Sequence, residues 1–225
     1  MAKEFLVGFI LVVAASTAAA TTLTLHNLCP YPVWPLVTPN TGFPSISDNT
    51  AWLDGGGRGL VSFRFPPTFW AGRVVARTGC VSGEHRRCET GDAPPATVAQ
   101  LAVHAAGDVA AYSVSLVDGF NVPAVVSPQA VGGGECAADV NAACPRARRV
   151  VGAGGAVVAC RNDHGDASAG WFKARCPLTR TTATDVEPVP QRCLAPGELK
   201  IVFCQPAMVG ASGEPELIRT VVADN

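Results

Sequence analysis

Short segments of the chain alternate apolar and polar residues, and turn-forming clusters separate one segment from the next. Leu23 and Leu25 are spaced by threonines, and Val61, Phe63 and Phe65 are spaced by polar residues. A period of two is typical of strands that bury one face. The pattern therefore predicts a chain built mainly of half-buried β-strands.

Nine segments carry this signal strongly enough to be predicted as strands. Clusters such as DGGGRG and GDAPPA lie between them and favour turns. Strands this short and this closely spaced indicate an all-β sandwich or barrel. The predicted strands are 22–28, 33–38, 59–65, 73–78, 97–104, 110–117, 122–126, 156–160 and 199–203.

One segment has helical spacing instead. Trp171, Phe172 and Arg175 fall on one face of a helix predicted over 167–175, which Cys176 and Pro177 end. It belongs to a region, residues 132–177, that holds four cysteines among glycine, alanine and arginine. We expect this region to form a small lobe that disulfides hold together, since it has too few apolar residues for a core of its own.

Both ends of the chain differ in composition from the segments between them. Residues 1–20 combine Lys3, a short apolar run and the small residues Ala18 and Ala20, which is typical of a secretory signal peptide. We expect one domain over residues 21–204. Residues 205–225 are predicted to be a disordered tail or a removable vacuolar-sorting segment. The expected location is therefore outside the cell, with the vacuole as the alternative.

Charge and motif content exclude several function classes. The formal net charge of −1 gives no strongly basic face for nucleic acid, and the apolar runs are too short for a transmembrane segment. His85 with Cys88 and Cys160 with His164 have spacings that a zinc site could use, but disulfides explain the same cysteines better. We expect no metal and no cofactor, and we expect a monomer.

A series of sequence blocks runs over nearly the whole chain after residue 20. The series consists of HNLCPYPVW (26–34), GRVVARTGC (72–80), CETGD (88–92), PPATVAQL (94–101), SLVDGFNVP (115–123), CAADV (136–140), CP (144–145), FKARCP (172–177) and IVFC (201–204). In this order the blocks resemble the thaumatin-like proteins of plants, and GFNVP and ARTGC are the most specific. The resemblance implies a thaumatin-like β-sandwich whose lobe is shortened.

The resemblance also implies a disulfide pairing, which the count of nine cysteines does not give by itself. Eight cysteines match family positions as complete pairs: Cys29 with Cys204, Cys80 with Cys88, Cys136 with Cys176, and Cys144 with Cys160. Cys193 also matches a family cysteine, but its partner would lie near Val131, in a stretch without cysteine. We therefore predict that Cys193 is a free thiol or forms an intermolecular bridge.

Members of the family with glucan-binding or antifungal roles have a cleft lined by an arginine, a glutamate and three aspartates. Two of these five residues stand in this chain, Arg73 and Asp118. Gln100 occupies the glutamate position and Ser113 one aspartate position. The last aspartate aligns with Val186, beside Asp185, which can serve if the alignment moves by one residue. The predicted cleft is much less acidic than the family pattern.

This loss of carboxylates argues against catalysis. Glycoside hydrolysis uses two carboxyl groups, one protonated and one ionised. Gln100 can bind a sugar hydroxyl, but it carries no proton to donate as a general acid. Binding needs only hydrogen-bonding groups and an apolar surface, for which Tyr112 and Phe120 are candidates, although both are also expected in the core.

The resulting prediction is a secreted plant defence protein that binds β-1,3-glucan or another fungal-wall polysaccharide without hydrolysing it. Two alternatives remain. One is a weak endo-β-1,3-glucanase that depends on Asp118. The other is an inhibitor of secreted microbial hydrolases that acts through loops such as 39–49. An ion pair between Arg73 and Asp118 that only orders strand ends is the structural alternative for those two residues.

Overall fold

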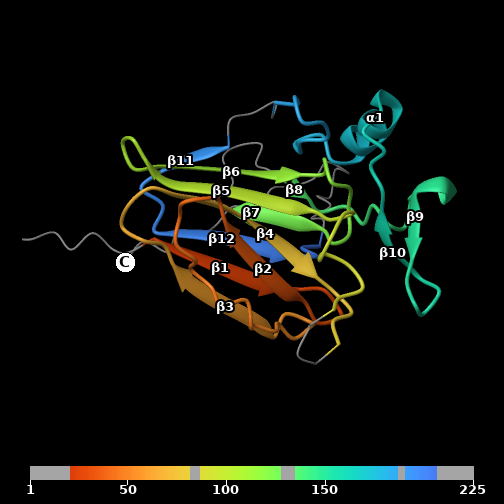
Figure 1. Ribbon diagram of the computed structural model, residues 1–225, viewed down its shortest axis with the longest axis horizontal. Coiled ribbons are helices and arrows are strands. Elements are labelled where there is room, and N and C mark those ends of the chain that lie inside the picture. The colour runs from red at the N-terminus through yellow and green to blue at the C-terminus, as the bar shows by residue number, and fades with distance from the viewer. Residues whose placement is uncertain (1–20, 82–86, 128–134, 187–190, 207–225) are drawn as a thin grey trace, which may run out of the picture.

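Two five-stranded sheets pack face to face and carry a small lobe at one end of their strands (Figure 1). The computed structural model describes residues 21–81, 87–127, 135–186 and 191–206. The predicted signal peptide, the predicted tail after residue 206 and the predicted cysteine partner position near Val131 lie outside these ranges.

The first sheet has the order β3-β1-β12-β7-β8. Its strands are β1 (Thr22–Asn27), β3 (Gly59–Arg64), β7 (Ala124–Ser127), β8 (Glu135–Cys136) and β12 (Glu198–Phe203). In its centre β1 pairs in parallel with β12, with Leu23 opposite Leu199 and Leu25 opposite Ile201. The beginning and the end of the domain are therefore neighbours.

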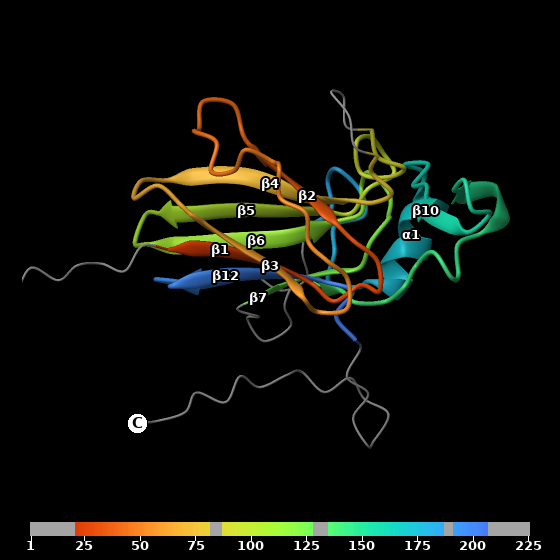
Figure 2. The same ribbon diagram turned by 90° about the horizontal axis from the view of Figure 1, so that it is seen from below.

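The second sheet has the order β11-β6-β5-β4-β2 and is antiparallel throughout. It consists of β2 (Trp34–Pro39), β4 (Trp70–Arg77), β5 (Val98–Ala105), β6 (Val109–Ser115) and β11 (Arg192–Leu194). In the view from below, β4, β5 and β6 lie above β1, β3 and β12 (Figure 2).

The core lies between the two sheets, as the alternation along the chain predicts. Leu23, Leu25 and Ile201 from the first sheet and Trp70 and Val114 from the second are fully buried. Phe120 is also fully buried, and Tyr112 is only 4% exposed. Both aromatic rings therefore belong to the core.

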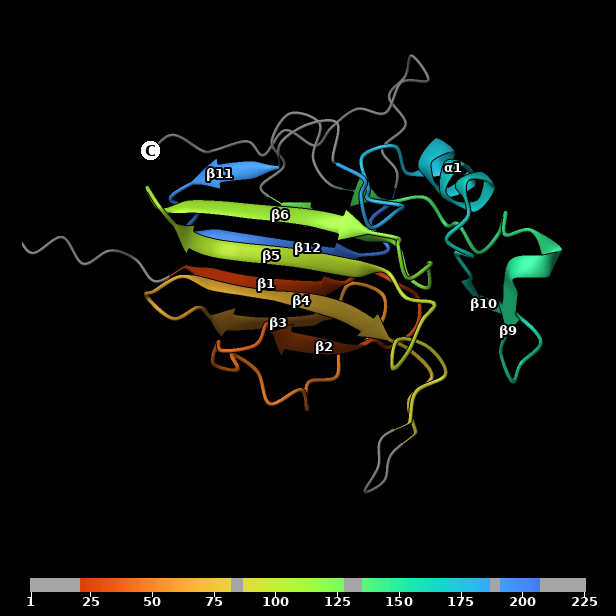
Figure 3. The same cartoon turned by 45° about the horizontal axis from the view of Figure 1, so that its top comes forward.

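The lobe lies beyond the ends of the sheet strands and contains a hairpin and a helix (Figure 3). The hairpin pairs β9 (Arg149–Val151) with β10 (Val157–Cys160), after a single 3₁₀ turn at Arg146–Arg148. The helix α1 (Asp166–Arg175) begins one residue before the predicted start and buries Phe172. No helix within the described ranges is long and apolar enough to cross a membrane.

Four disulfides join the pairs that the family resemblance implies: Cys29–Cys204, Cys80–Cys88, Cys136–Cys176 and Cys144–Cys160. The first closes a loop of 175 residues at the ends of β1 and β12. In the chain-entropy model a loop of that length stabilises the fold by about 5 kcal/mol. Cys193 is the free cysteine among the described residues.

The sequence pattern missed β8, β9 and β11. Each has three residues or fewer, which is too short to show a period of two. The longer strands differ from their predicted bounds at one or both ends. β4, for example, begins at Trp70 instead of Arg73, because Trp70 already pairs with Val103 of β5.

Candidate functional site

Three of the five predicted cleft residues lie side by side across the second sheet. Arg73 of β4 is directly opposite Gln100 of β5, and Gln100 is directly opposite Ser113 of β6. Residues paired in this way project from the same face of a sheet. Ala99 and Leu101, the chain neighbours of Gln100, are buried in the core, so the polar row faces away from the core.

A groove of about 310 Å³ lies over part of this row. Gln100 and Ser113 line it together with Ala102 and Ala111, and Val186 and Gln191 close it from the loop that leads to β11. Gln191 is 5% exposed, its amide donates to the carbonyl of Leu178 at 3.2 Å, and its Oε1 has no partner among the described residues. The groove combines apolar side chains with neutral hydrogen-bonding groups and one charged residue, Arg192.

Asp118 lies further along the same sheet, after the end of β6. Its carbonyl accepts a hydrogen bond from the amide of Ala96 at 3.0 Å. The buried cluster of Val75, Ala96 and Val98 stands between this turn and the polar row, because Val98 precedes Gln100 by two residues on the same strand face. No ion pair joins Arg73 to Asp118, although the structure describes both residues.

Asp185 does not line the groove, whereas Val186 beside it does. The carboxylate of Asp185 accepts hydrogen bonds from Lys173 Nζ at 2.8 Å and from the amide of Thr181 at 3.0 Å. Burial favours the protonated form, but these contacts outweigh it and hold the pKa of Asp185 below its usual value. Asp185 therefore orders the segment that follows α1.

The cysteines that the sequence places near histidines are not available as thiolates. Cys88 and Cys160 are both in disulfides. Within the ranges the structure describes, no three histidine, cysteine, aspartate or glutamate side chains gather in a way that could hold a metal ion.

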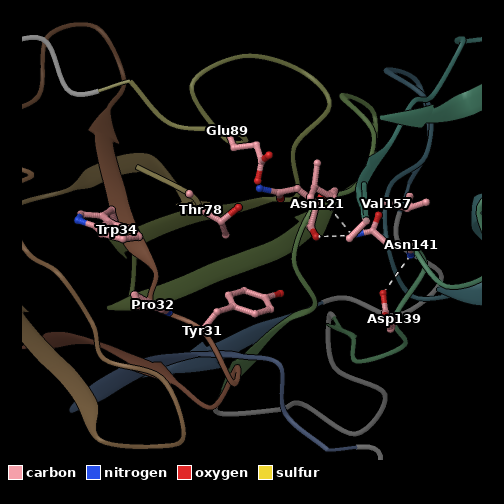
Figure 4. A pocket seen from close by; sticks show the side chains of 12 residues that line it. Tyr31, Pro32, Trp34, Thr78, Glu89, Asn121, Asp139, Asn141 and Val157 are labelled. Carbon is pink, nitrogen blue, oxygen red and sulfur yellow. Dashed lines mark hydrogen bonds between the residues drawn. The ribbon is translucent and has the colours of Figure 1, made fainter. Parts of the chain in front are cut away.

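A second pocket, of about 440 Å³, opens where the sheets meet the lobe (Figure 4). Tyr31, Trp34, Thr78 and Asn121 line it from the sandwich. Residues Asp139, Asn141 and 156–158 line it from the lobe. Gly79 and Glu89, which flank the loop that the Cys80–Cys88 disulfide closes, also line it. None of the five predicted cleft residues lines this pocket.

Sequence reasoning missed this pocket because its residues come from several separate segments. Tyr31, Thr78, Glu89 and Asn121 do lie within blocks that carry the family resemblance. Their positions along the chain do not show that these side chains meet at one cavity.

Comparison with known proteins agrees with the fold and the motifs. The model of the Thaumatin family matches residues 27–169. The chain belongs to the thaumatin family. An osmotin-like protein of Solanum lycopersicum is 35% identical over 81% of this chain and 88% of its own length.

Two other relatives match over a shorter part of each sequence. Thaumatin-like protein 2 of Prunus persica is 38% identical over 64% of both chains, and a protein of Prunus avium named glucan endo-1,3-beta-glucosidase is 37% identical over 64% of this chain and 65% of its own. Among solved structures, the thaumatin-like xylanase inhibitor TLXI is 24% identical, covers 81% of this chain, and has a TM-score of 0.47.

Proposed function

We propose that this thaumatin family member is a secreted plant defence protein that binds β-1,3-glucan, or a related fungal-wall polysaccharide, without hydrolysing it. The observation that carries the proposal is the row of Arg73, Gln100 and Ser113 beside a groove of about 310 Å³. The sequence similarity to the Prunus avium protein named glucan endo-1,3-beta-glucosidase supports glucan as the ligand class.

The row offers both donors and acceptors to sugar hydroxyls. Arg73 and Gln100 are exposed and present guanidinium and amide groups, and Ser113 adds a hydroxyl. Ala102 and Ala111 leave room for the apolar face of a sugar ring. Arrangements of this kind, an apolar surface with a few polar groups, are typical of ligand sites.

The same geometry disfavours catalysis. A glycosidase needs one carboxyl that is protonated at working pH. Gln100 and Ser113 supply none, and hydrogen bonds from Lys173 and Thr181 keep Asp185 ionised. Asp118 follows the end of β6, where its carbonyl accepts a hydrogen bond from the amide of Ala96. This arrangement supports binding over hydrolysis.

Sedimentation with insoluble β-1,3-glucan tests the proposal. We expect the wild-type protein to co-sediment, and Arg73→Ala and Gln100→Ala each to reduce the bound fraction severalfold. Arg64→Ala is the matched control, because Arg64 is an exposed arginine on β3 of the other sheet and should leave binding unchanged. Failure of the wild type to co-sediment would refute glucan binding.

The same preparation separates the alternatives. Release of reducing sugar from laminarin that disappears in Asp118→Ala would favour the glucanase. Capture of secreted fungal hydrolases, without retention on glucan, would favour the inhibitor. We expect neither result.

A further inference from the structure

The pocket of about 440 Å³ at the junction of the sandwich and the lobe shares no lining residue with the groove of about 310 Å³ beside Gln100 and Ser113. The two sites also differ in chemistry. The two charged lining residues of the larger pocket are both acids, Glu89 and Asp139. Among the residues that the structure describes, no lysine, arginine or histidine lines it. An occupant that brings positive charge would therefore meet no repulsion from the pocket wall.

The amide donors that line the pocket are already used within the protein. Asn121 Nδ2 donates to the carbonyl of Ala76 at 2.8 Å and to Thr90 Oγ1 at 3.0 Å. Asn141 Nδ2 donates to the carbonyls of Asn121 at 2.8 Å and Val158 at 3.2 Å. The polar capacity left for a ligand therefore consists mainly of carboxylate acceptors.

Glu89 is held in place by the local backbone. Its Oε1 accepts a hydrogen bond from the amide of Ala153 at 2.7 Å. Gly79 and Gly152 leave room for its side chain, because a Cβ atom on either glycine would collide with Glu89. The second carboxylate oxygen can still accept a hydrogen bond.

The opposite wall of the pocket is aromatic (Figure 4). The backbone of Tyr31 is held in place, since Asn27 Nδ2 donates a hydrogen bond to its carbonyl oxygen at 2.9 Å. Trp34 lines the pocket and stacks on Trp52, with ring centroids 6.1 Å apart and planes 8° apart. Trp52 is 60% exposed, so the aromatic surface continues outside the pocket. Such faces attract cations and pack on the apolar faces of rings.

Asp139 and Tyr31 act on each other across the pocket. Burial raises the pKa of the Tyr31 hydroxyl, and the negative charge of Asp139 raises it further. The phenol therefore stays neutral; its hydroxyl donates to Cys204 Sγ at 3.8 Å, and its oxygen can still accept a hydrogen bond from a ligand. Asp139 Oδ1 accepts the amide of Asn141 at 3.0 Å, which fixes the orientation of this carboxylate.

We propose that this pocket is a second binding site, for a ligand that carries ammonium groups on sugar rings, such as an oligomer of glucosamine. The ammonium groups bind to Glu89 and Asp139, and the rings pack on Tyr31 and Trp34. An oligomer has an ammonium group on each ring, so one molecule offers a cation to each of the two carboxylates that line the pocket. The proposal does not depend on glucan binding in the groove.

Isothermal titration with glucosamine tetramer tests this site. We expect saturable binding that weakens as sodium chloride is raised, because salt screens charge pairs. N-acetylglucosamine tetramer has the same ring without the charge, and spermidine has the charge without the ring. Both are expected to bind at least tenfold more weakly than glucosamine tetramer.

Two isosteric variants identify the carboxylates. Glu89→Gln and Asp139→Asn retain the oxygens that accept from Ala153 and Asn141, so both should fold normally. Each should weaken glucosamine tetramer binding about fivefold, as for one partly screened charge contact. Asp163→Asn removes an exposed carboxylate of the same lobe outside the pocket and serves as control.

The proposal is overturned by any of three results: equal affinity for the N-acetylated tetramer, equal affinity for spermidine, or unchanged affinity in both variants. Retention of the two variants on β-1,3-glucan, measured in parallel, shows that they are folded and that the groove is unaffected. If the wild-type protein does not bind β-1,3-glucan, the proposed function is refuted, whereas the proposal of a second binding site is not.

Discussion

Gln100 and Ser113 are direct cross-strand partners, and Ser113 Oγ lies 3.3 Å from Gln100 Oε1. Family members with an acidic cleft have two carboxylates at these positions. Like charges directly opposite each other on a sheet repel, and one of the two carboxyls then has a raised pKa. The neutral pair in this chain removes both the repulsion and the source of a protonated carboxyl.

Restoring the two acids should therefore make stability depend on pH. In Gln100→Glu/Ser113→Asp the folded-state pKa of one carboxyl rises above its unfolded value, so the variant loses stability as pH rises from about 3 to 7. We expect a cost of about 1 kcal/mol at pH 7, or about 2–4 °C in melting temperature. Calorimetry at several pH values measures it. Gln100→Glu alone is the control, and equal pH profiles for the two variants would contradict the expectation.

The contact between Asp185 and Lys173 gives the opposite pH dependence. The lowered pKa of Asp185 means that its contribution is present above about pH 4 and is lost as pH falls through the folded-state value. Asp185→Asn should cost about 1–3 kcal/mol in unfolding free energy at pH 7, and less at pH 3. Denaturant unfolding at both pH values tests this prediction.

Asp163→Asn provides the comparison for Asp185. Asp163 pairs with Arg148 Nε at 3.0 Å, but its side chain is 58% exposed. Exposed ion pairs contribute little, so this variant should lose less than about 1 kcal/mol. Equal losses in the two variants would show that burial of the Asp185 contact has no effect.

Two features require glycine at position 79, namely its left-handed backbone conformation and the close approach of the Glu89 side chain. The φ of Gly79 is +62°, and a Cβ atom there would lie 2.7 Å from Cβ of Glu89. Gly79→Ala should cost about 1–3 kcal/mol and weaken glucosamine tetramer binding, because Glu89 must move. Gly107 has φ +77° and nothing within 4 Å of a Cβ, so Gly107→Ala isolates the backbone cost. Equal affinity of Gly79→Ala and Gly107→Ala for glucosamine tetramer would show that Glu89 does not contribute to binding in the pocket.

Cys193 should be the one cysteine that alkylates without reduction, and it should react slowly at neutral pH. Burial raises the pKa of its thiol, and the negative charge of Asp108 raises it further, so little thiolate forms at pH 7. We expect labelling by iodoacetamide to accelerate between about pH 7 and 10, as followed by mass spectrometry.

Asp108→Asn is the matched variant for Cys193. Asp108 has φ +55°, a conformation that asparagine also adopts, so the fold should be retained. Removing the charge should make labelling faster at pH 8. An intramolecular bridge at Cys193 in the monomer would contradict both expectations.

The sequence was most informative where a residue's environment depends on its near neighbours or on a family motif. The alternation around Leu23 and Val61 predicted strands, and the blocks around the cysteines implied the four disulfides found. The short strand β11 escaped detection, since three residues hold no repeat. Its place beside β6 comes from pairing between Cys193 and Ala110, which are far apart along the chain.

The amino-acid sequence by itself determined the all-β class, the thaumatin family membership, the cysteine set and the loss of acids at positions 100 and 113. Only the tertiary structure decided that Arg73, Gln100 and Ser113 form one row, that Asp185 turns toward Lys173, and that Glu89 and Asp139 line one pocket. The physical reason is that strand register and loop placement follow from core packing between distant segments. A local pattern of polar and apolar residues does not contain that information.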